Sequence, residues 1–370
     1  MKYSLYFITI LLLLVGCSKD VESYEVFEFN FEQPANFPNP TYDFENHNIT
    51  TEGFVLGRKL FYDNRLSLNN SISCAECHNQ SHAFTHHGHD LSEGVHAGVT
   101  GTRNSQPIQN LAYMEDFTWD GAKDKLLDQP VIPITEPVEM DEKMTNVVAK
   151  LKLDDEYQQM FSKAFQKEDA INSTNLLSAL SQFMGGMVSS NSKYDKYVRG
   201  EKGGEFTARE KQGLALFNQK CASCHSGELF TNQKFMNNGI EENPNFPSET
   251  GRARINSPNP FATVEELKQR DDYYQFRVPS LRNVKVTFPY MHDGRIVLLK
   301  KVLDFYDDDT FPKITKMKNL DESLIQKNDK GEITSLGIPM TEDEKVAILA
   351  FLDTLTDYEF INDERFARPN

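Results

Sequence analysis

The sequence predicts a mainly α-helical protein built from two similar small domains with long loops. The motif Cys-x-x-Cys-His occurs twice, beginning at Cys74 and at Cys221, and apolar residues with helical spacing precede each copy. Segments in which apolar and polar residues alternate, as in half-buried strands, are scarce. A length of 370 residues also favours two domains over one.

The predicted helices before the two motifs resemble each other. Residues 52–63 and 207–220 both place apolar side chains on one helical face, and both contain the sequence Gly-x-x-Leu-Phe. Thr207 and Glu210 have the spacing of a capping box at the start of the second helix. A further helix is predicted over 341–355. The similarity indicates an internal repeat of one small helical domain.

Domain boundaries follow from this repeat. We expect an N-terminal domain over 45–200 and a C-terminal domain over 201–370. The glycine-rich and charged stretch 191–210 has the composition of a linker. The stretch 237–261 is polar and rich in proline and asparagine, so it is expected to be a surface loop.

The first residues have the composition of an export signal. Lys2 precedes an apolar run of 12 residues, which is too short to span a membrane, and the run ends in Gly16 and Cys17. We therefore predict a lipoprotein signal peptide over 1–17, lipidated at Cys17, followed by a flexible acidic tether over 18–44. An ordinary secretory signal with an incidental cysteine is the alternative. The lipoprotein prediction implies an exported, lipid-anchored protein on the periplasmic side of a membrane or at the outer membrane.

Composition excludes two classes of protein. Hydrophobic residues make up 39% of the chain, which is too few for a multispanning membrane protein. The formal net charge of −16 argues against nucleic acid as a partner, because like charges repel. A basic protein partner or a small neutral substrate fits this charge better.

The remaining four cysteines belong to the two motifs. Paired cysteines at this spacing serve redox dithiols, zinc sites and covalent haem attachment. Only haem attachment explains a histidine directly after each pair, because that histidine ligates the iron. The predicted attachment residues of two haem c groups are Cys74, Cys77, Cys221 and Cys224, and the predicted iron ligands are His78 and His225.

The chain resembles the bacterial di-haem cytochrome c peroxidases and their relative MauG, the maturase of a tryptophan cofactor. The similar stretches include LGRKLFYDNRLSLNNSISCAECH, GTRNSQPIQN, FTWDGAKDKLLDQPVIPITEPVEM, GLALFNQKCASCH and FRVPSLRNVKVTFPYMHDGRIVLLKKVLDFY. They follow the family's order over roughly residues 50–306. The resemblance implies two cytochrome c-like domains and allows the C-terminal segment to pack on the first domain.

The resemblance implies catalytic residues near the first haem. Glu139, in PVEM, matches the family's acid–base residue above the peroxidatic iron, with Glu136 as a weaker alternative. Gln129 matches a glutamine of the same pocket. Trp119, the only tryptophan, matches the residue that relays electrons between the two haems.

A histidine-rich loop follows the first motif. His96 matches the loop histidine that ligates the first iron in resting peroxidases, and neighbouring glycines would let such a loop move. The other loop histidines have no family counterpart and are expected to be solvated, with incidental metal binding as the alternative. They are His82, His86, His87 and His89.

The second haem is implied to be the site of electron entry. Its sixth ligand in the peroxidases is a methionine, and the matching position here is Tyr306, as in MauG-like proteins. A phenolate would favour Fe(III), whereas methionine would raise the potential. Met291 is a rival ligand, although core packing is the commoner fate of methionine. Its neighbour His292 is expected to support the site rather than ligate.

The resemblance also implies one Ca²⁺ near the domain junction. Asn104 matches the family's asparagine ligand. The backbone carbonyl oxygens of Thr287 and Pro289 match the other protein ligands, and waters would complete the oxygen donor set.

Three functions remain open at this point. The leading one is a peroxidase that reduces hydrogen peroxide with electrons from a small donor such as a cytochrome c or a cupredoxin. The second is a MauG-like oxidase that modifies a partner protein, which Tyr306 favours and His96 does not. The third is an electron carrier, for which Glu139 and Gln129 would be superfluous. Homodimers are common among the relatives and are compatible with this chain.

Overall fold

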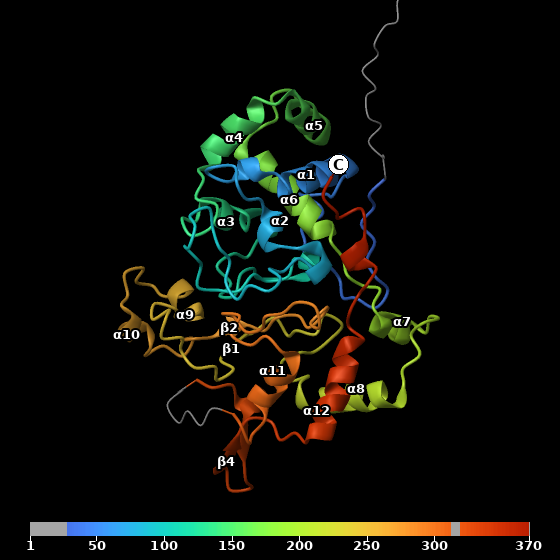
Figure 1. Ribbon diagram of the computed structural model, residues 1–370, viewed down its shortest axis with the longest axis vertical. Coiled ribbons are helices and arrows are strands. Elements are labelled where there is room, and N and C mark those ends of the chain that lie inside the picture. Colours follow the sequence, from blue (N-terminus) through green and yellow to red (C-terminus); the bar gives the residue numbers. More distant parts are fainter. Residues whose placement is uncertain (1–27, 312–318, 370) are drawn as a thin grey trace, which may run out of the picture.

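The computed structural model describes residues 28–311 and 319–369. It has an upper lobe from the first half of the chain and a lower lobe from the second (Figure 1). Helix accounts for 36% and strand for 7%, which confirms a mainly helical fold. Cys17 and the predicted signal peptide lie outside the described residues. No helix of the described ranges has both the length and the apolar character needed to cross a bilayer.

A pair of helices packed at a glycine organises the upper lobe. Helix α1 (Thr51–Phe61) packs mainly against α6 (Ser173–Gly186). At Gly57 a Cβ atom would lie only 2.0 Å from the carbonyl oxygen of Ala179 and 2.8 Å from Cβ of Phe183. The absence of a side chain at Gly57 is therefore what lets the two helices approach this closely.

The lower lobe repeats this arrangement. Helix α8 (Ala208–Lys220) packs against α12 (Glu342–Asp353). At Gly213 a Cβ atom would lie 2.0 Å from the carbonyl oxygen of Ala347 and 2.8 Å from Cβ of Phe351. The same contacts at the same distances in both lobes are the structural form of the predicted internal repeat.

The predicted capping box at the start of α8 is confirmed. The Thr207 hydroxyl accepts a hydrogen bond from the Glu210 backbone N–H at 3.2 Å, and the Glu210 carboxylate accepts one from the Thr207 N–H at 2.6 Å. Thr341 and Glu344 begin α12 in the same way. These caps satisfy backbone donors that the first helical turn leaves unpaired.

The other elements are short and are joined by long loops. The further helices are α2 (Cys74–Cys77), α3 (Val131–Thr135), α4 (Met144–Lys152), α5 (Asp155–Phe165), α7 (Lys193–Arg199), α9 (Arg252–Ile255), α10 (Val264–Leu267) and α11 (Leu299–Tyr306). Strand β1 (Phe235–Met236) pairs antiparallel with β2 (Phe276–Arg277), and β3 (Ile325–Lys327) pairs antiparallel with β4 (Ile333–Leu336).

Residues 28–44 contradict the prediction of a flexible tether over 18–44. Phe29 is buried and stacks on Phe54 of α1, with ring centroids 4.1 Å apart. Phe37 is buried in the same hydrophobic core. The stretch lacks the regular period that marks a helix or a strand, but its phenylalanines bury enough apolar surface to hold it on the upper lobe.

The end of the chain returns to the upper lobe (Figure 1). Phe360, Ile361 and Phe366 are buried in the core that α1 and α6 share. The ring of Phe366 lies 6.2 Å from that of Phe54. The C-terminal segment therefore links the lobes by packing on the first after α12 has packed in the second.

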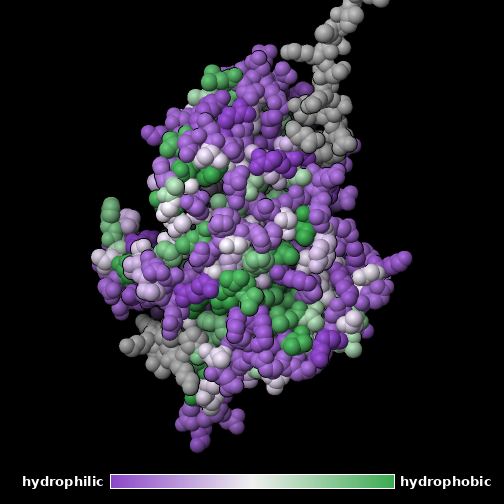
Figure 2. All heavy atoms as spheres, in the orientation of Figure 1, coloured by the Kyte–Doolittle hydropathy of each residue, from purple (hydrophilic) through white to green (hydrophobic). Residues whose placement is uncertain are grey.

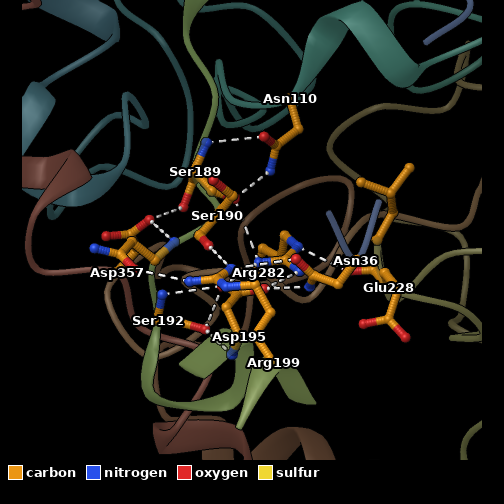
Figure 3. Close-up of polar contacts among 12 residues, drawn as sticks. Asn36, Asn110, Ser189, Ser190, Ser192, Asp195, Arg199, Glu228, Arg282 and Asp357 are labelled. Atoms are coloured by element: carbon orange, nitrogen blue, oxygen red, sulfur yellow. Dashed lines mark hydrogen bonds and ion pairs between the residues drawn. The ribbon is translucent and has the colours of Figure 1, made fainter. Parts of the chain in front are cut away.

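A buried polar cluster around Arg282 also joins the lobes (Figure 3). The Arg282 side chain is fully buried, and its guanidinium donates to both oxygens of Asp195 in α7 at 2.8 and 2.9 Å. It also donates to the carbonyl oxygens of Glu228 (2.8 Å) and Ser189 (3.3 Å). The predicted linker 191–210 therefore contains a helix that a buried ion pair fixes in place.

The insert 237–261 is only partly the surface loop that its composition predicts. Ile240 and Ala253 are buried in a hydrophobic cluster. Glu249 is buried and accepts two hydrogen bonds from Arg103, at 2.6 and 2.8 Å. A few apolar and charged side chains thus anchor an otherwise polar segment to the body of the protein.

Candidate functional site

The first Cys-x-x-Cys-His motif forms the short helix α2 and the residue after it. The backbone N–H of His78 donates to the Cys74 carbonyl at 3.0 Å, which closes the turn. Nδ1 of the His78 ring lies 2.7 Å from the carbonyl oxygen of Phe84, so Nε2 remains available to a metal. Burial lowers the pKa of His78, which keeps the ring in the neutral form that binds iron.

The second motif has the same local geometry. The His225 N–H donates to the Cys221 carbonyl at 2.9 Å, and Nδ1 of the ring lies 3.1 Å from the carbonyl oxygen of Phe230. Burial lowers the pKa of His225 to about 4. Phe84 and Phe230 both have left-handed backbones, with φ of 61° and 53°. Each motif therefore presents one fixed imidazole beside two cysteines.

One cavity in the lower lobe brings the second motif together with the predicted sixth ligands. Its lining includes Cys221, Cys224, His225, Met291 and Tyr306. Much of the remaining wall is apolar and includes Phe217, Val278, Leu281, Val284 and Leu303. Hydrophobic residues gather on the face of the lower lobe around α11 (Figure 2). Two thiols, a fixed imidazole and apolar walls fit a covalently attached haem.

Tyr306 and Met291 both reach this cavity. Tyr306 is the last residue of α11, and burial raises the pKa of its phenol to about 12. Met291 has a left-handed backbone with φ of 73°. Both line the cavity with His225, and which of them is the sixth ligand stays a prediction.

Two residues of this cavity were not identified from the sequence. Asn238 donates from Nδ2 to the Tyr306 hydroxyl at 3.0 Å. The sulfur of Met236 lies 3.4 Å from Sγ of Cys224. Asn238 lies in the stretch that its composition assigned to a surface loop. The segment from Cys221 to Met236 contains no pattern that ties a methionine to the motif.

Glu139 lies close to the first motif. Burial, reinforced by the negative charge of Glu136, raises the pKa of Glu139 to about 7. Burial also raises the pKa of Cys74 to about 12 and of Cys77 to about 11, and the charge of Glu139 adds to both shifts. Gln129 directly precedes Pro130 and α3 on the segment that leads to Glu139.

His96 is paired with a carboxylate in this structure. Its Nε2 lies 2.8 Å from Oδ2 of Asp141, and the side chain is 48% exposed. The loop nevertheless touches the predicted acid segment, because the Val95 N–H donates to the Glu139 carbonyl at 2.8 Å. The residue before His96 is therefore hydrogen-bonded to the backbone of Glu139. The role of His96 as an iron ligand stays a prediction.

The other loop histidines form two stacked pairs. The rings of His82 and His87 lie 3.6 Å apart, and those of His86 and His89 lie 4.3 Å apart. Within residues 28–311 and 319–369, no three His, Cys, Asp or Glu side chains gather to hold a metal ion. In particular, the two cysteine pairs do not meet, as a tetrathiolate zinc site would require.

Segment 104–107 connects the two sites. Asn104 lines the cavity of the second motif, and the backbone of Gln106 lies close to the ring of His78 in the first. Trp119 lines the same cavity and donates from Nε1 to the Asn104 carbonyl at 2.8 Å. The indole is therefore fixed to the strip of backbone that separates the two motifs.

The three predicted calcium ligands lie along this cavity. Asn104, Thr287 and Pro289 all belong to its lining. Nδ2 of Asn104 donates to the carbonyl oxygen of Asp90 at 2.9 Å, which leaves Oδ1 as the amide atom that could bind a cation. The site itself stays a prediction.

Comparisons with known proteins point to one family. The sequence model described as di-haem cytochrome c peroxidase matches residues 51–203. The methylamine utilization protein MauG of Methylorubrum extorquens is 35% identical over 75% of this chain and 73% of its own. The cytochrome c551 peroxidase of Nitrosomonas europaea is 31% identical over 67% of this chain and 71% of its own. A crystal structure of a MauG-like protein associated with microbial copper homeostasis has a TM-score of 0.74 at 30% identity, covering 92% of this chain and 99% of that one.

Peroxidases and MauG proteins thus match at comparable identity, over most of the chain. Their common ground is a family described as di-haem, and this chain has two Cys-x-x-Cys-His motifs of matching local geometry. On this evidence the chain belongs to the di-haem cytochrome c peroxidase family, which includes MauG, and is an oxidoreductase that carries two haems.

Proposed function

We propose that the protein is a peroxidase in which one molecule of hydrogen peroxide, two electrons and two protons give two molecules of water. The electrons come from a small redox protein, a cytochrome c or a cupredoxin, and enter at the second haem on His225. The observation that carries this proposal is Glu139, a half-buried carboxyl group near Cys74 and Cys77 with a pKa raised to about 7.

Glu139 supplies the proton transfer that peroxide cleavage requires. When bound, the haem on His78 supplies the iron that holds peroxide and passes electrons to it. The carboxylate takes the proton from the near oxygen and returns it to the leaving oxygen, which departs as water. A pKa near 7 suits both steps, because similar fractions of the group are then ionised, as a base, and protonated, as an acid, near neutral pH. The amide of Gln129 helps to hold the peroxide.

Trp119 carries the electron between the two sites. Its support is the contact with Asn104, in the segment that touches both motifs. In this proposal His96 leaves the partner Asp141 to close the first site, and its loop moves against the backbone of Glu139. One Ca²⁺ would bind Asn104 with the carbonyl oxygens of Thr287 and Pro289.

Export and anchoring complete the proposal. Members of this family are typically periplasmic. Lipidation at Cys17 would hold this chain at a membrane surface, on the periplasmic side or at the outer membrane. The net charge of −16 favours a basic electron donor, which it would attract at long range. A homodimer is compatible with this arrangement.

A MauG-like oxidase is the second candidate, and Tyr306 favours it. A phenolate on the second iron stabilises the oxidised form, so the protein would react with peroxide without prior reduction. It would then oxidise an aromatic side chain of a partner protein instead of taking electrons from a donor. The 35% identity to a MauG protein and the likeness to a MauG-like protein associated with copper homeostasis support this candidate.

Spectroscopy of the exported holoprotein tests the two proposals. The peroxidase predicts that the first haem becomes high-spin when the second is reduced, and that turnover with a reduced donor needs this half-reduced state. A spectral change on adding peroxide to the fully oxidised protein, without donor turnover, would favour the MauG-like oxidase. If neither state reacts with peroxide, both proposals fail and only electron carriage is left.

A further inference from the structure

The side-chain amide of Asn238 lies against both candidate sixth ligands of the second haem. Nδ2 of Asn238 is 3.0 Å from the hydroxyl oxygen of Tyr306 and 3.7 Å from the sulfur of Met291. The two candidate ligands thus share this amide as a neighbour, and all three side chains line the cavity that contains His225.

The orientation of this amide is fixed by the backbone. Oδ1 of Asn238 accepts a hydrogen bond from the N–H of Ile240 at 3.2 Å, so the NH₂ group is the end that faces Tyr306 and Met291. The preceding residue, Asn237, is buried and donates to the side chain of Asn319 at 3.1 Å. The amide therefore approaches the cavity as a donor and never as an acceptor.

Tyr306 is held from the other side. Its backbone carbonyl accepts from the Ile338 N–H at 2.7 Å. Lys345, which is almost fully buried, pairs with Asp304 at 3.0 Å and with Asp307 at 2.5 Å, on either side of the tyrosine. Helix α11 is thereby tied to α12, which holds in place the backbone that carries the phenol.

We infer that Asn238 is a positioning residue that selects Tyr306, rather than Met291, as the sixth ligand of the second haem. The inference rests on the proposed function only for a haem held at His225, and a tyrosine ligand there favours the MauG-like candidate. A phenolate oxygen accepts a charge-assisted hydrogen bond, whereas a thioether sulfur is a weak acceptor. The amide therefore stabilises an oxygen ligand at this position far more than a sulfur ligand.

The test uses the oxidised holoprotein without peroxide. Asn238→Asp preserves shape and the acceptor for Ile240 but places a carboxylate oxygen against the phenolate, and Asn238→Leu removes both polar atoms. The matched control is Asn232→Asp. Asn232 also accepts a backbone N–H with Oδ1, and its Nδ2 lies 3.8 Å from a methionine sulfur, that of Met236. Among the described residues, its side chain makes no hydrogen bond to a tyrosine. Near-infrared and electron paramagnetic resonance spectra distinguish tyrosinate from thioether ligation, and spectroelectrochemistry gives the midpoint potential.

We expect tyrosinate signatures in the unaltered protein and in Asn232→Asp. Both Asn238 variants should lose that signature in most molecules, gain a thioether signature and show a higher midpoint potential of the second haem. Adding Met291→Leu should abolish the thioether signature. The inference is overturned if the Asn238 variants keep the spectrum and potential of the unaltered protein, or if the unaltered protein already has a thioether ligand. A ligand switch in a protein without peroxidase turnover would count against the proposed function alone.

Discussion

The indole of Trp119 donates a 2.8 Å hydrogen bond to the backbone carbonyl of Asn104. Two residues further on, the backbone of Gln106 contacts His78, the predicted ligand of the first iron. The only tryptophan of the chain is therefore attached to the segment that separates the two haem motifs, with its ring in the lining of the second cavity.

Replacing Trp119 by Phe should slow electron transfer between the two sites. Phe keeps an aromatic ring but loses the indole and its bond to Asn104. We expect the rate at which the first haem receives an electron from the second to fall by about tenfold or more, equivalent to about 1.4 kcal/mol of barrier. Stopped-flow spectroscopy of the half-reduced protein measures this rate. Phe261→Leu, at a ring that is 90% exposed, is the control, and equal rates in both variants would refute the relay.

Replacing Glu139 by Gln should remove proton transfer while leaving the haems attached. Loss of a general acid–base residue lowers kcat by about 10²–10⁴-fold. Because burial raises the pKa of Glu139 to about 7, the base form grows as pH rises, and activity should rise through pH 7. The Glu139→Gln variant should lose this rise in activity through pH 7.

Glu136→Gln provides the matched control for this prediction. It removes a neighbouring negative charge that helps to raise the pKa of Glu139. In this variant the rise in activity with pH should persist but occur at lower pH, and kcat at high pH should be little changed. If Glu136→Gln lost activity and Glu139→Gln remained fully active, the catalytic residue would be Glu136 instead of Glu139.

Gly213→Ala should destabilise the lower lobe although alanine is the better helix former. The intrinsic preference for alanine in a helix is worth about 1 kcal/mol. The new Cβ would lie 2.0 Å from the Ala347 carbonyl oxygen, and such overpacking costs about 1–3 kcal/mol in well-packed interiors. We expect a net loss in the free energy of unfolding, measured with denaturant on the holoprotein. Gly101→Ala, where no atom lies within 4 Å of the new Cβ, should be unchanged or slightly more stable.

Arg282→Met should be among the most destabilising substitutions in the chain. It would leave the carboxylate of Asp195 buried without its cation, and breaking such a pair costs about 3–5 kcal/mol. Lys285→Met is the control, because the pair of Lys285 with Asp353 is about half exposed and contributes about 1 kcal/mol or less. Denaturant midpoints of the two variants should differ clearly, and similar midpoints would contradict a structural role for the buried pair.

The ion pair of Arg282 and Asp195 should also make the free energy of unfolding decrease at acidic pH. Burial acts to raise the pKa of Asp195, but the hydrogen bonds and charge of Arg282 prevail and hold it below its usual value. The stabilisation is therefore complete above the ordinary carboxyl range and is lost as pH falls through the depressed pKa of the folded protein. Asp195→Asn should be less stable at neutral pH and should lose less stability on acidification.

The sequence by itself determined the haem chemistry and the repeat. Covalent attachment needs two cysteines and a histidine at fixed spacing. The role of Cys74, Cys77 and His78 can therefore be recognised from the sequence alone. The apolar period before each motif and the box of Thr207 and Glu210 predict α1 and α8, because helix formation is decided by neighbours three and four residues apart.

Only the tertiary structure decided the contacts between distant segments. The burial of Phe29 against Phe54 depends on a core that the local sequence does not contain, which is why 28–44 has the composition of a tether and yet packs. Asn238 is one asparagine in a polar insert until folding brings α11 beside it. A side chain's partner across many residues is set by packing geometry, and neither composition nor periodicity records that geometry.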